Sequence, residues 1–550
     1  MGERPVPSRE FSVRPLSRGG ILVGWGDLLL QMGAYPETIK DTMQYEGVPQ
    51  IFVVPERLFD TQLGVSAAEL EFPIYFNFYC KSRMTRFVCR PHQLRPLIRV
   101  LKEAVFGPSS LDYANEYLQG AATPGFPDLG AEMRWYKQDD RFPGGRLRLR
   151  NMVTPSVFDA EGKVDLDGYC LQALGHDRYR LSYQGQSHEF GYSRPGVVSD
   201  QPAAAETKPP FLPPVFGLTV LGSGHGFDVQ SLTSGFILWV NGKGILVDPP
   251  VHTTEWLRRE NVDSRYIEDI VLTHCHADHD SGTLQKILQE GRITVHTTTT
   301  VMDSFVRKYR SLTGLSGAQF AKLFEFRAVP VGQVVNVAGA DFVFDYRLHP
   351  IPTLGFVASF QGRRFAYSCD TLYDPVAIKN LCSEGVLSQE RCQSLLDFDW
   401  QADLILHEAG IPPIHTPIQV LADLPAEVRR RMYITHISES AIPADSGLRL
   451  APPGAEKTIV LPVPPQDTSH SQQMLDVLSH VDLFQSLSLG RAAEFLRISR
   501  YNKIPAGTKI CTTGEVGEDF HIILSGVAQV SREGHLIKHA GRYDYFGEIA

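Results

Sequence analysis

The sequence predicts an α/β protein of several domains, and three observations carry this prediction. Its 550 residues exceed the roughly 150 residues of an ordinary domain. Two proline-rich stretches, 202–214 and 462–473, divide the chain into three blocks. The middle block alternates short apolar runs with helical patterns, as α/β folds do. We therefore expect domains at 1–205, 206–465 and 474–550.

Composition narrows the class of protein. With 43% hydrophobic and 21% charged residues, the chain has ample material for packed cores. The 53 basic and 62 acidic residues give a net charge of −9, which argues against a surface that coats nucleic acid. The eight cysteines contain no C-x-x-C pair, and no run approaches the roughly 20 apolar residues that cross a bilayer. We expect a soluble, cytoplasmic protein without a membrane partner.

The first block predicts an α+β accessory domain of unknown role. Residues 93–105 have a helical pattern, and the aromatic run 73–79 resembles a strand. We expect the wider run 72–87 to be buried strands and not a pocket wall. No metal-ligand cluster or phosphate loop stands out in this block.

The second block predicts a strand-rich core with helices between the strands. We expect strands at 216–221, 236–240, 244–247, 267–272, 342–348 and 356–360, an extended segment at 292–296, and helices at 254–261, 282–289 and 301–312. A loop rich in histidine directly follows the strand 267–272.

That loop has the composition of a metal site. Its sequence THCHADH places His274, His276, Asp278 and His279 within six residues. An accidental H-x-H-x-[DE]-H match is expected in only about two chains per thousand of this composition. Charged imidazoles crowded together repel unless a cation neutralises them. In an extended or tightly turned segment, the first two histidines face one ion while the last two residues face another, so we expect two ions, with Cys275 packed and not ligating.

Further ligands are expected at the ends of later strands. His349 follows the apolar strand 342–348, Asp370 follows the apolar run 365–367, and His436 follows residues 432–435. A single histidine at a strand end is usually an ordinary surface histidine. The order of these three residues after the THCHADH loop makes them ligand candidates.

Residues 216–460 resemble the metallo-β-lactamase superfamily, in the branch of ribonuclease Z and the class II cyclic nucleotide phosphodiesterases. The resemblance lies in ILVDPP, THCHADH, HPIPTLGF, the Asp370 turn, His407-Glu408-Ala409, His415-Thr416 and the final T-H-x-S. It implies an αββα sandwich holding two divalent metal ions, zinc by default. Two departures concern the backbone: Ser368-Cys369 replaces the usual glycine before the aspartate, and Pro249-Pro250 follows Asp248.

The resemblance also implies a role for each ligand and for two catalytic groups. One ion would be held by His274, His276 and His349, the other by Asp278, His279 and His436, with Asp370 between them. Asp278 would orient the attacking hydroxide, and Glu408 with His415 would protonate the leaving oxygen. A purely supporting, hydrogen-bonding role for His407 and Glu408 is an equal alternative.

Residues 480–550 resemble the cyclic nucleotide-binding domain. The matching motifs are L-F-x-x-L, P-A-G, G-E-x-G-[ED]-x-F and a terminal F-G-E. They imply an incomplete β-barrel in which backbone N–H groups after Gly547 face a cyclic phosphate and Glu548 accepts the ribose 2′-hydroxyl. The arginine that pairs with the phosphate in this family would lie several residues later. We therefore expect this chain to be a fragment of a longer protein and to bind cyclic nucleotide poorly by itself.

Together these features predict a dinuclear metal-dependent phosphodiesterase that hydrolyses cyclic nucleotides and is regulated by their binding. One alternative is an RNA 3′-processing endonuclease like ribonuclease Z, although the 21 positions from His349 to Asp370 leave little room for its substrate arm. Thioester or lactone hydrolysis is a smaller possibility. A non-catalytic metal-binding cyclic nucleotide sensor is the alternative from another class. The preference for cAMP or cGMP, the metal and the oligomeric state stay open.

Overall fold

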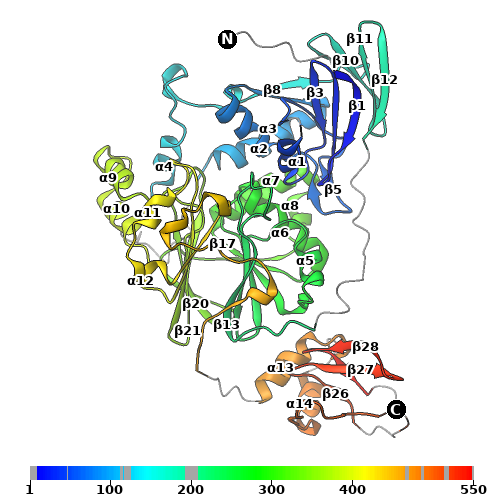
Figure 1. The fold of residues 1–550 in the computed structure, drawn as a ribbon, viewed down its shortest axis with the longest axis vertical. Coiled ribbons are helices and arrows are strands. Elements are labelled where there is room, and N and C mark those ends of the chain that lie inside the picture. Colours follow the sequence, from blue (N-terminus) through cyan, green and yellow to red (C-terminus); the bar gives the residue numbers. More distant parts are fainter. Residues whose placement is uncertain are drawn as a thin grey trace. The chain divides into compact units, whose positions relative to one another are not determined.

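The computed structural model describes residues 9–45, 47–111, 116, 125–192, 209–464, 470–484, 489–512, 514 and 519–547. The chain forms two compact units (Figure 1). The first comprises Met1–Asp200, Pro214–Trp256 and Ile267–Leu461, and the second comprises Gln201–Pro213, Leu257–Tyr266 and Pro462–Ala550. Within the described part of the chain, no helix combines the length and apolarity needed to cross a membrane.

Two mixed sheets form the centre of the first unit. The seven-stranded sheet has the order β18 (Glu325–Ala328), β17 (Thr294–Thr297), β16 (Ile267–Val271), β15 (Lys243–Val247), β14 (Gly235–Val240), β13 (Phe216–Gly222), β25 (Ile459–Val460). The six-stranded sheet has the order β19 (Val334–Val337), β20 (Ala340–Tyr346), β21 (Leu354–Phe360), β22 (Arg363–Tyr367), β23 (Leu404–Glu408), β24 (Met432–Thr435). β13, β14 and β23 are buried at every residue, as strands covered on both faces are, whereas the edge strand β18 is exposed throughout.

The two sheets pack face to face and helices cover their outer faces. The ring of Phe236 in β14 lies 5.7 Å from that of Phe365 and 4.8 Å from that of Tyr367, both in β22. One group of helices lies beside the first sheet and another beside the second (Figure 1). The first group consists of α5 (Thr253–Arg259), α6 (Ala277–Glu290), α7 (Thr299–Thr313) and α8 (Gly317–Phe320). The second group consists of α9 (Pro375–Ser383), α10 (Gln389–Leu396), α11 (Ile418–Ala422) and α12 (Ala426–Arg429). The predicted αββα sandwich is confirmed.

The histidine-rich loop differs from its prediction in one respect. Helix α6 begins at Ala277 and not near residue 282, so Asp278 and His279 lie in its first helical turn. Only His274 and His276 belong to the extended segment. A helical turn after an extended segment directs the two pairs of side chains to different positions, which is the separation that two ions need.

The N-terminal block has its own sheets. A six-stranded sheet has the order β1 (Arg9–Pro15), β2 (Ile21–Gly26), β3 (Leu28–Met32), β4 (Ile51–Val53), β7 (Thr85–Cys89), β8 (Val153–Val157). A four-stranded sheet has the order β12 (Gln186–Gly191), β11 (Arg178–Tyr183), β10 (Tyr169–Gly175), β9 (Lys163–Leu166), and β5 (Phe59–Asp60) pairs with β6 (Val65–Ser66). Its helices are α1 (Thr38–Gln44), α2 (Glu71–Tyr75), α3 (Pro91–Phe106) and α4 (Leu129–Trp135).

The prediction of a strand at 73–79 is wrong. Residues Glu71–Tyr75 form α2, and Phe76–Cys80 continue it as a five-residue π-helix. A short, continuously aromatic run has no period that distinguishes strand from helix. Not all of it is buried, because Tyr79 is 50% exposed. The wider run is therefore not a set of buried strands.

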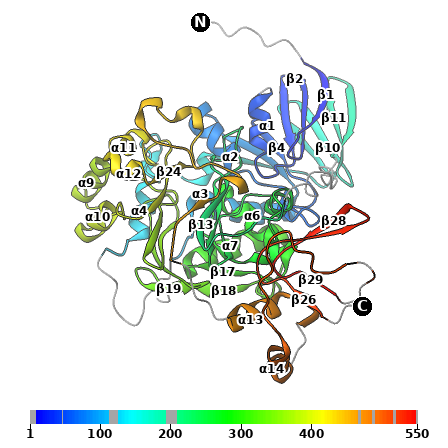
Figure 2. The ribbon, with the colours of Figure 1, turned by 60° about the horizontal axis from the view of Figure 1, so that its bottom comes forward.

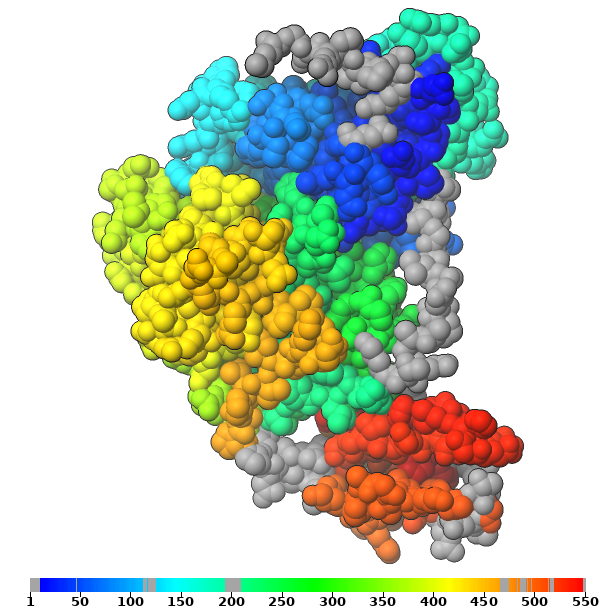
Figure 3. Space-filling view, viewed as in Figure 1, coloured from blue at the N-terminus to red at the C-terminus, as the bar shows by residue number. Residues whose placement is uncertain are grey.

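The N-terminal block packs against the sandwich within the same unit. Arg307 in α7 pairs with Glu103 in α3 at 2.8 Å, and the buried Arg391 in α10 pairs with Glu132 in α4 at 2.9 Å. In Figure 2, α2 and α3 lie on the side of the sandwich that carries α6 and α7. In the space-filling view, the blue atoms of the N-terminal block lie directly against green atoms of the sandwich (Figure 3).

Among the described residues after 461, the second unit contains two antiparallel strand pairs and the helices α13 (His470–His480) and α14 (Leu489–Ile498). Strand β26 (His521–Ile522) pairs with β29 (Tyr545–Phe546), and β27 (Ala528–Arg532) with β28 (His535–Ala540). Gly547 has φ +92°, and a Cβ there would lie 2.5 Å from the Asp519 carbonyl oxygen, so only glycine fits. Glu548 lies outside the described residues.

Candidate active site

The residues singled out in the sequence meet at one edge of the two sheets. His274 and His276 follow β16, His349 follows β20, Asp370 follows β22, and His436 follows β24. β16 runs parallel to β15 and β17, and β22, β23 and β24 run parallel to one another. β20 runs in the direction of β22, with the antiparallel β21 between them, so the carboxyl ends of these strands bring the following residues together. The seven predicted ligands are all buried, between 0% and 7% exposed.

Three imidazole nitrogens converge at a first position. His276 Nδ1 lies 3.2 Å from His274 Nε2 and 3.0 Å from His349 Nε2. Two nitrogens of a tetrahedral zinc site, each about 2.05 Å from the ion, lie about 3.3 Å apart. The spacing of the three nitrogens therefore suits a single ion.

A second position is formed by the helical pair of the loop and the last histidine. Asp278 Oδ2 lies 3.1 Å from His436 Nε2, and Asp278 Oδ1 lies 3.8 Å from His279 Nε2. Candidate ligand atoms of Asp278, His279 and His436 lie within 4.8 Å of one another. An aspartate and two histidines are a donor set that zinc and related ions accept.

Asp370 lies between the two positions. Its Oδ2 is 3.8 Å from both His274 Nε2 and His349 Nε2, and 3.5 Å from His436 Nε2. Its Oδ1 is 3.3 Å from His279 Nε2 and, like that nitrogen, has no hydrogen-bond partner among the described residues. Buried polar atoms without partners are costly, so their concentration at this point fits ions that they would coordinate.

The protonation states of the three histidines at the first position and of Asp370 also fit metal binding. Burial and neighbouring imidazoles lower the pKa of His274 and His349 well below the usual value, and burial lowers the pKa of His276 to about 3. Burial opposes ionisation of Asp370, but the imidazoles of His436 and His279 outweigh it and hold the pKa of this carboxyl well below its usual range. Neutral imidazoles and ionised carboxylates are the forms that bind metal ions. At the second position, burial lowers the pKa of His279, but the carboxylates of Asp370 and Asp278 outweigh it and raise this pKa well above its usual value.

Asp248 orients one of these imidazoles. Its Oδ2 lies 3.0 Å from His279 Nδ1, and its oxygens also accept the Thr273 N–H at 2.9 Å and the Thr273 hydroxyl at 2.6 Å. With a proton on Nδ1, His279 presents Nε2 to the second position. The buried carboxylate of Asp248 thus contacts both Thr273, which directly precedes the ligand His274, and the imidazole of His279.

The pair Ser368-Cys369, which stands where the family usually has a glycine before the aspartate, adopts an unusual backbone conformation. Cys369 has φ +51°, in the left-handed region where glycine is ordinarily preferred. Its thiol is fully buried and lies 3.1 Å from Thr273 Oγ1. Cys275 instead donates to the Val301 carbonyl at 3.6 Å, as expected for a packed and non-ligating cysteine.

Glu408 and His415 form a pair beside the ligands. Glu408 Oε1 accepts the backbone N–H groups of Thr371 at 3.2 Å and Thr416 at 2.8 Å, while Oε2 lies 3.2 Å from His415 Nδ1. His415 is partly exposed, and its ring lies 4.7 Å from that of His436. His407 faces the other way, stacked on Trp400 with ring centres 5.5 Å apart.

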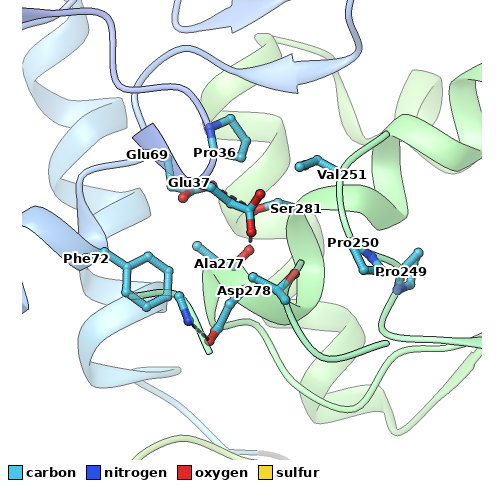
Figure 4. Close-up of a pocket in the computed structure, with 12 residues that line it drawn as sticks. Pro36, Glu37, Glu69, Phe72, Pro249, Pro250, Val251, Ala277, Asp278 and Ser281 are labelled. Carbon is cyan, nitrogen blue, oxygen red and sulfur yellow. Dashed lines mark hydrogen bonds between the residues drawn. The ribbon is translucent and has the colours of Figure 1, made fainter. Parts of the chain in front are cut away.

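Sequence reasoning missed the N-terminal block's contribution to this site. The Ala277 N–H donates to Glu71 Oε2 at 3.1 Å, and the Ser281 hydroxyl donates to Glu69 Oε2 at 2.7 Å. Figure 4 shows Glu69 and Phe72 beside α6, near Ser281, Ala277 and Asp278. No local motif marks these contacts, because the two glutamates are separated from α6 by about 200 residues of sequence.

Aromatic side chains border the ligands on the same side. The ring of Tyr75 lies 6.4 Å from that of His276 at 88°, and the ring of Phe72 lies 5.2 Å from that of Phe227 at 90°. Phe76 is 6.5 Å from Phe227, and Tyr79 is 6.2 Å from Tyr75. Tyr75 and Phe76 are half-buried, so an aromatic surface stands next to the ligand cluster.

Comparisons with known proteins place this site in a family. The family model described as anti-Pycsar protein Apyc1 matches residues 216–448. The cGMP-dependent 3′,5′-cGMP phosphodiesterase A of Dictyostelium discoideum is 32% identical over 97% of this chain and 75% of its own length. The chain belongs to the cyclic nucleotide phosphodiesterases of the metallo-β-lactamase type. The enzyme is accordingly a hydrolase whose fold binds divalent metal ions, as the converging ligands indicate.

Two further relatives cover different parts of the enzyme. The cAMP/cGMP-dependent 3′,5′-cAMP/cGMP phosphodiesterase B of Dictyostelium discoideum is 30% identical over 90% of this chain, which spans half of that relative's length. A cAMP-dependent protein kinase regulatory subunit of Eremothecium gossypii is 36% identical over 76 residues, 14% of this chain and 17% of its own. The latter likeness agrees with the cyclic nucleotide-binding type predicted for the C-terminal block.

Proposed function

We propose that this enzyme hydrolyses the 3′,5′-cyclic phosphodiester bond of cAMP or cGMP, with two zinc ions at its centre. The observation that carries the proposal is the convergence of seven buried ligand side chains at two adjacent positions. The relatives that extend over most of the chain are named as phosphodiesterases of these nucleotides, which supports the substrate class. Imidazole with carboxylate favours zinc among common divalent ions.

The proposed ligand roles follow the distances. His274, His276 and His349 would hold the first ion, Asp278, His279 and His436 the second, and Asp370 would contact both. When bound, two such ions supply positive charge beside the phosphoryl group and lower the pKa of water. We also assign to the Asp278 carboxylate the orientation of the attacking water. This carboxylate borders the ligand cluster, and the residue is 7% exposed.

The leaving 3′-oxygen would receive its proton from His415. This imidazole is the partly exposed member of the cluster, and Glu408 is held behind it by two backbone N–H groups. Burial lowers the pKa of His415, but the carboxylates of Glu408 and Asp370 outweigh it and raise the pKa to about 9. Glu408 thus keeps His415 protonated and oriented and does not itself transfer the proton.

The aromatic surface beside His276 would receive the base of the nucleotide. Bases stack on aromatic rings without needing a sequence-specific contact, and Tyr75 and Phe76 are half-buried within reach of the ligand cluster. This surface accounts for why the N-terminal block belongs to the same compact unit as the sandwich.

Regulation is proposed to reside in the C-terminal block. Gly547 and Glu548 would contact the cyclic phosphate and the ribose of a regulatory nucleotide, and the requirement for glycine at residue 547 supports the first contact. We also propose that the sequence is organised as three domains, at 1–205, 206–465 and 474–550. A cytoplasmic location is proposed from the sparse cysteine content.

An RNA 3′-processing activity is less well supported by the geometry. The segment between His349 and Asp370 is occupied by the strand pair β21 and β22, with a short turn at residues 361–362. A substrate arm would need an inserted segment there.

Zinc analysis combined with a substrate panel tests the proposal. We expect about two zinc ions per chain and faster turnover of cAMP or cGMP than of a precursor RNA. A chain that binds no zinc, or one that binds zinc and cleaves only RNA, would contradict it. Two bound ions without hydrolysis of any phosphodiester would favour a non-catalytic sensor.

A further inference from the structure

The two nitrogens of the His276 imidazole have different surroundings: Nδ1 faces other candidate ligand atoms, whereas Nε2 does not. Its Nδ1 faces His274 Nε2 and His349 Nε2 at 3.2 and 3.0 Å, so Nδ1 is the atom that would bind an ion. A neutral imidazole that binds through Nδ1 carries its proton on Nε2. That nitrogen is buried and has no hydrogen-bond partner among the described residues. A donor in this position needs an acceptor.

The nearest carboxylate comes from the N-terminal block. Glu71, the first residue of α2, is 2% exposed, and its Oε1 lies 3.9 Å from His276 Nε2. This oxygen is likewise buried without a hydrogen-bond partner among the residues that the structure describes. The other oxygen, Oε2, accepts the Ala277 N–H at 3.1 Å. An unpartnered donor and an unpartnered acceptor therefore face each other across a short gap.

We propose that Glu71 is a positioning residue that accepts the Nε2–H of His276 and fixes this imidazole for the first metal ion. The inference rests on the proposed two-metal centre. A shift of about 1 Å in either side chain brings the two atoms to hydrogen-bond distance. Histidine ligands commonly donate their second N–H to a carboxylate, which sets the tautomer and strengthens the ligand.

The position of α2 supports this role. Four residues after Glu71, the ring of Tyr75 lies edge-on to the His276 ring, with centres 6.4 Å apart. The helix therefore covers the outer side of the imidazole with one carboxylate and one aromatic ring. Metal affinity at the first position thus depends on residues that precede His276 by about 200 positions in the sequence.

The competing explanation is that Glu71 serves only the packing of α6. Ala277 is the first residue of that helix, so accepting its N–H satisfies one free donor of the helix terminus. Glu71→Gln separates the two explanations. A carboxylate accepts both N–H groups, whereas an amide has one accepting oxygen and must present its NH2 group to the other donor. Because the existing hydrogen bond joins this side chain to the Ala277 N–H, the glutamine oxygen stays on that donor and the NH2 group faces His276, so the histidine contact is the one that is lost.

The chain offers a matched control two residues away. Glu69 is half-buried, and its Oε2 accepts the Ser281 hydroxyl at 2.7 Å on the same helix α6. It contacts none of the ligand imidazoles in the described structure. Glu69→Gln thus makes the same chemical change at the same interface without touching His276.

The experiment measures zinc affinity by competition with a chromophoric chelator for the full chain, Glu71→Gln and Glu69→Gln. We expect the first ion to bind 10- to 100-fold more weakly in Glu71→Gln and unchanged in Glu69→Gln. The metal-free forms of the parent and of Glu71→Gln should unfold at similar temperatures. Cobalt(II) in place of zinc should show an altered visible spectrum in Glu71→Gln only.

Three results would overturn the inference. They are equal zinc affinity in the parent and Glu71→Gln, equal weakening in both variants, and weakening that merely follows a lower melting temperature of the metal-free chain. A parent that binds no zinc would overturn the proposed function as well, so the two failures are distinguishable. If Glu71→Gln does not fold, 15N-histidine spectra of the zinc-loaded parent decide: a protected, downfield His276 Nε2–H supports the bond, and a rapidly exchanging one refutes it.

Discussion

His415 Nδ1 lies 3.2 Å from Glu408 Oε2, and the opposite oxygen of Glu408 is held by two backbone N–H groups. The carboxylate therefore has a fixed position beside the imidazole. β23 ends at Glu408, and His415 lies on the segment that follows. A strand end and a short turn are therefore enough to bring Glu408 and His415 together.

The first prediction concerns His415→Ala. Loss of a general acid should reduce turnover of cyclic nucleotides by about 10²- to 10⁴-fold and leave zinc content unchanged. A p-nitrophenyl phosphodiester, whose leaving group needs no proton, should lose much less. Equal losses for the two substrates, measured by steady-state kinetics, would show that His415 does not act as the acid.

The second prediction concerns Asp278→Ala, which removes a ligand at the second metal position. We expect hydrolysis of every phosphodiester to fall to background and zinc content to fall toward one ion per chain. The exposed Asp303 in α7 provides the control, because Asp303→Asn removes a similar charge far from the ligand set. Elemental analysis with circular dichroism checks the result, and full activity in the Asp278 variant would contradict the ligand role.

The third prediction tests the aromatic surface with two substitutions at Tyr75. Stacking of a base on an aromatic ring contributes about 1–3 kcal/mol, so Tyr75→Leu should raise KM for cyclic nucleotides about 5- to 150-fold. Tyr75→Phe retains the ring and should keep KM near that of the parent. The hydrolysis of bis(p-nitrophenyl) phosphate, which carries no nucleobase, serves as a reference. A leucine variant with unchanged KM would exclude stacking at this residue.

The fourth prediction concerns stability and pH. Burial raises the pKa of Glu69 to about 8, from an ordinary value of 4.5, and the Ser281 hydroxyl and Lys308 only partly oppose this shift. A carboxyl whose folded pKa is raised favours the folded state below pH 4.5, and this contribution is lost as pH rises toward 8. The contribution of Glu69 to the free energy of unfolding should therefore fall by up to about 1.4 kcal/mol per pH unit in that window.

Glu69→Gln isolates this effect, because the amide cannot ionise. The free energy of unfolding of Glu69→Gln, relative to that of the parent, should increase steadily between pH 5 and pH 8. Urea unfolding of both proteins across that range provides the measurement. Parallel stability curves would mean that Glu69 does not carry the raised pKa.

Most of the metal cluster could be predicted from the sequence for a physical reason. Four ligands lie within one loop, and His349, Asp370 and His436 each follow an apolar strand, so strand pairing alone brings them together. Each ligand is thus marked by local sequence. The helical start of α6 could not be predicted, because His276, which makes no side-chain capping hydrogen bond, stands where Ser, Thr, Asp or Asn would mark the helix start.

The contribution of the N-terminal block could not be predicted in this way. Glu71 reaches His276 only through the packing of α2 on α6, a tertiary contact across about 200 residues. The aromatic run around Tyr75 favours the prediction of a strand, because it lacks the polar positions that would reveal its helical period. Side-chain function that depends on packing between blocks leaves no mark in a single sequence.

The central claim is that a centre built from these seven ligands cleaves a 3′,5′-cyclic phosphodiester. The most direct test is steady-state hydrolysis of cGMP and cAMP by the zinc-loaded chain, with the product identified by chromatography and Asp278→Ala measured in parallel. The account predicts a nucleoside 5′-monophosphate, formed catalytically by the parent and not by the variant. No product from either nucleotide with two zinc ions bound, or equal product from the parent and the variant, would contradict it.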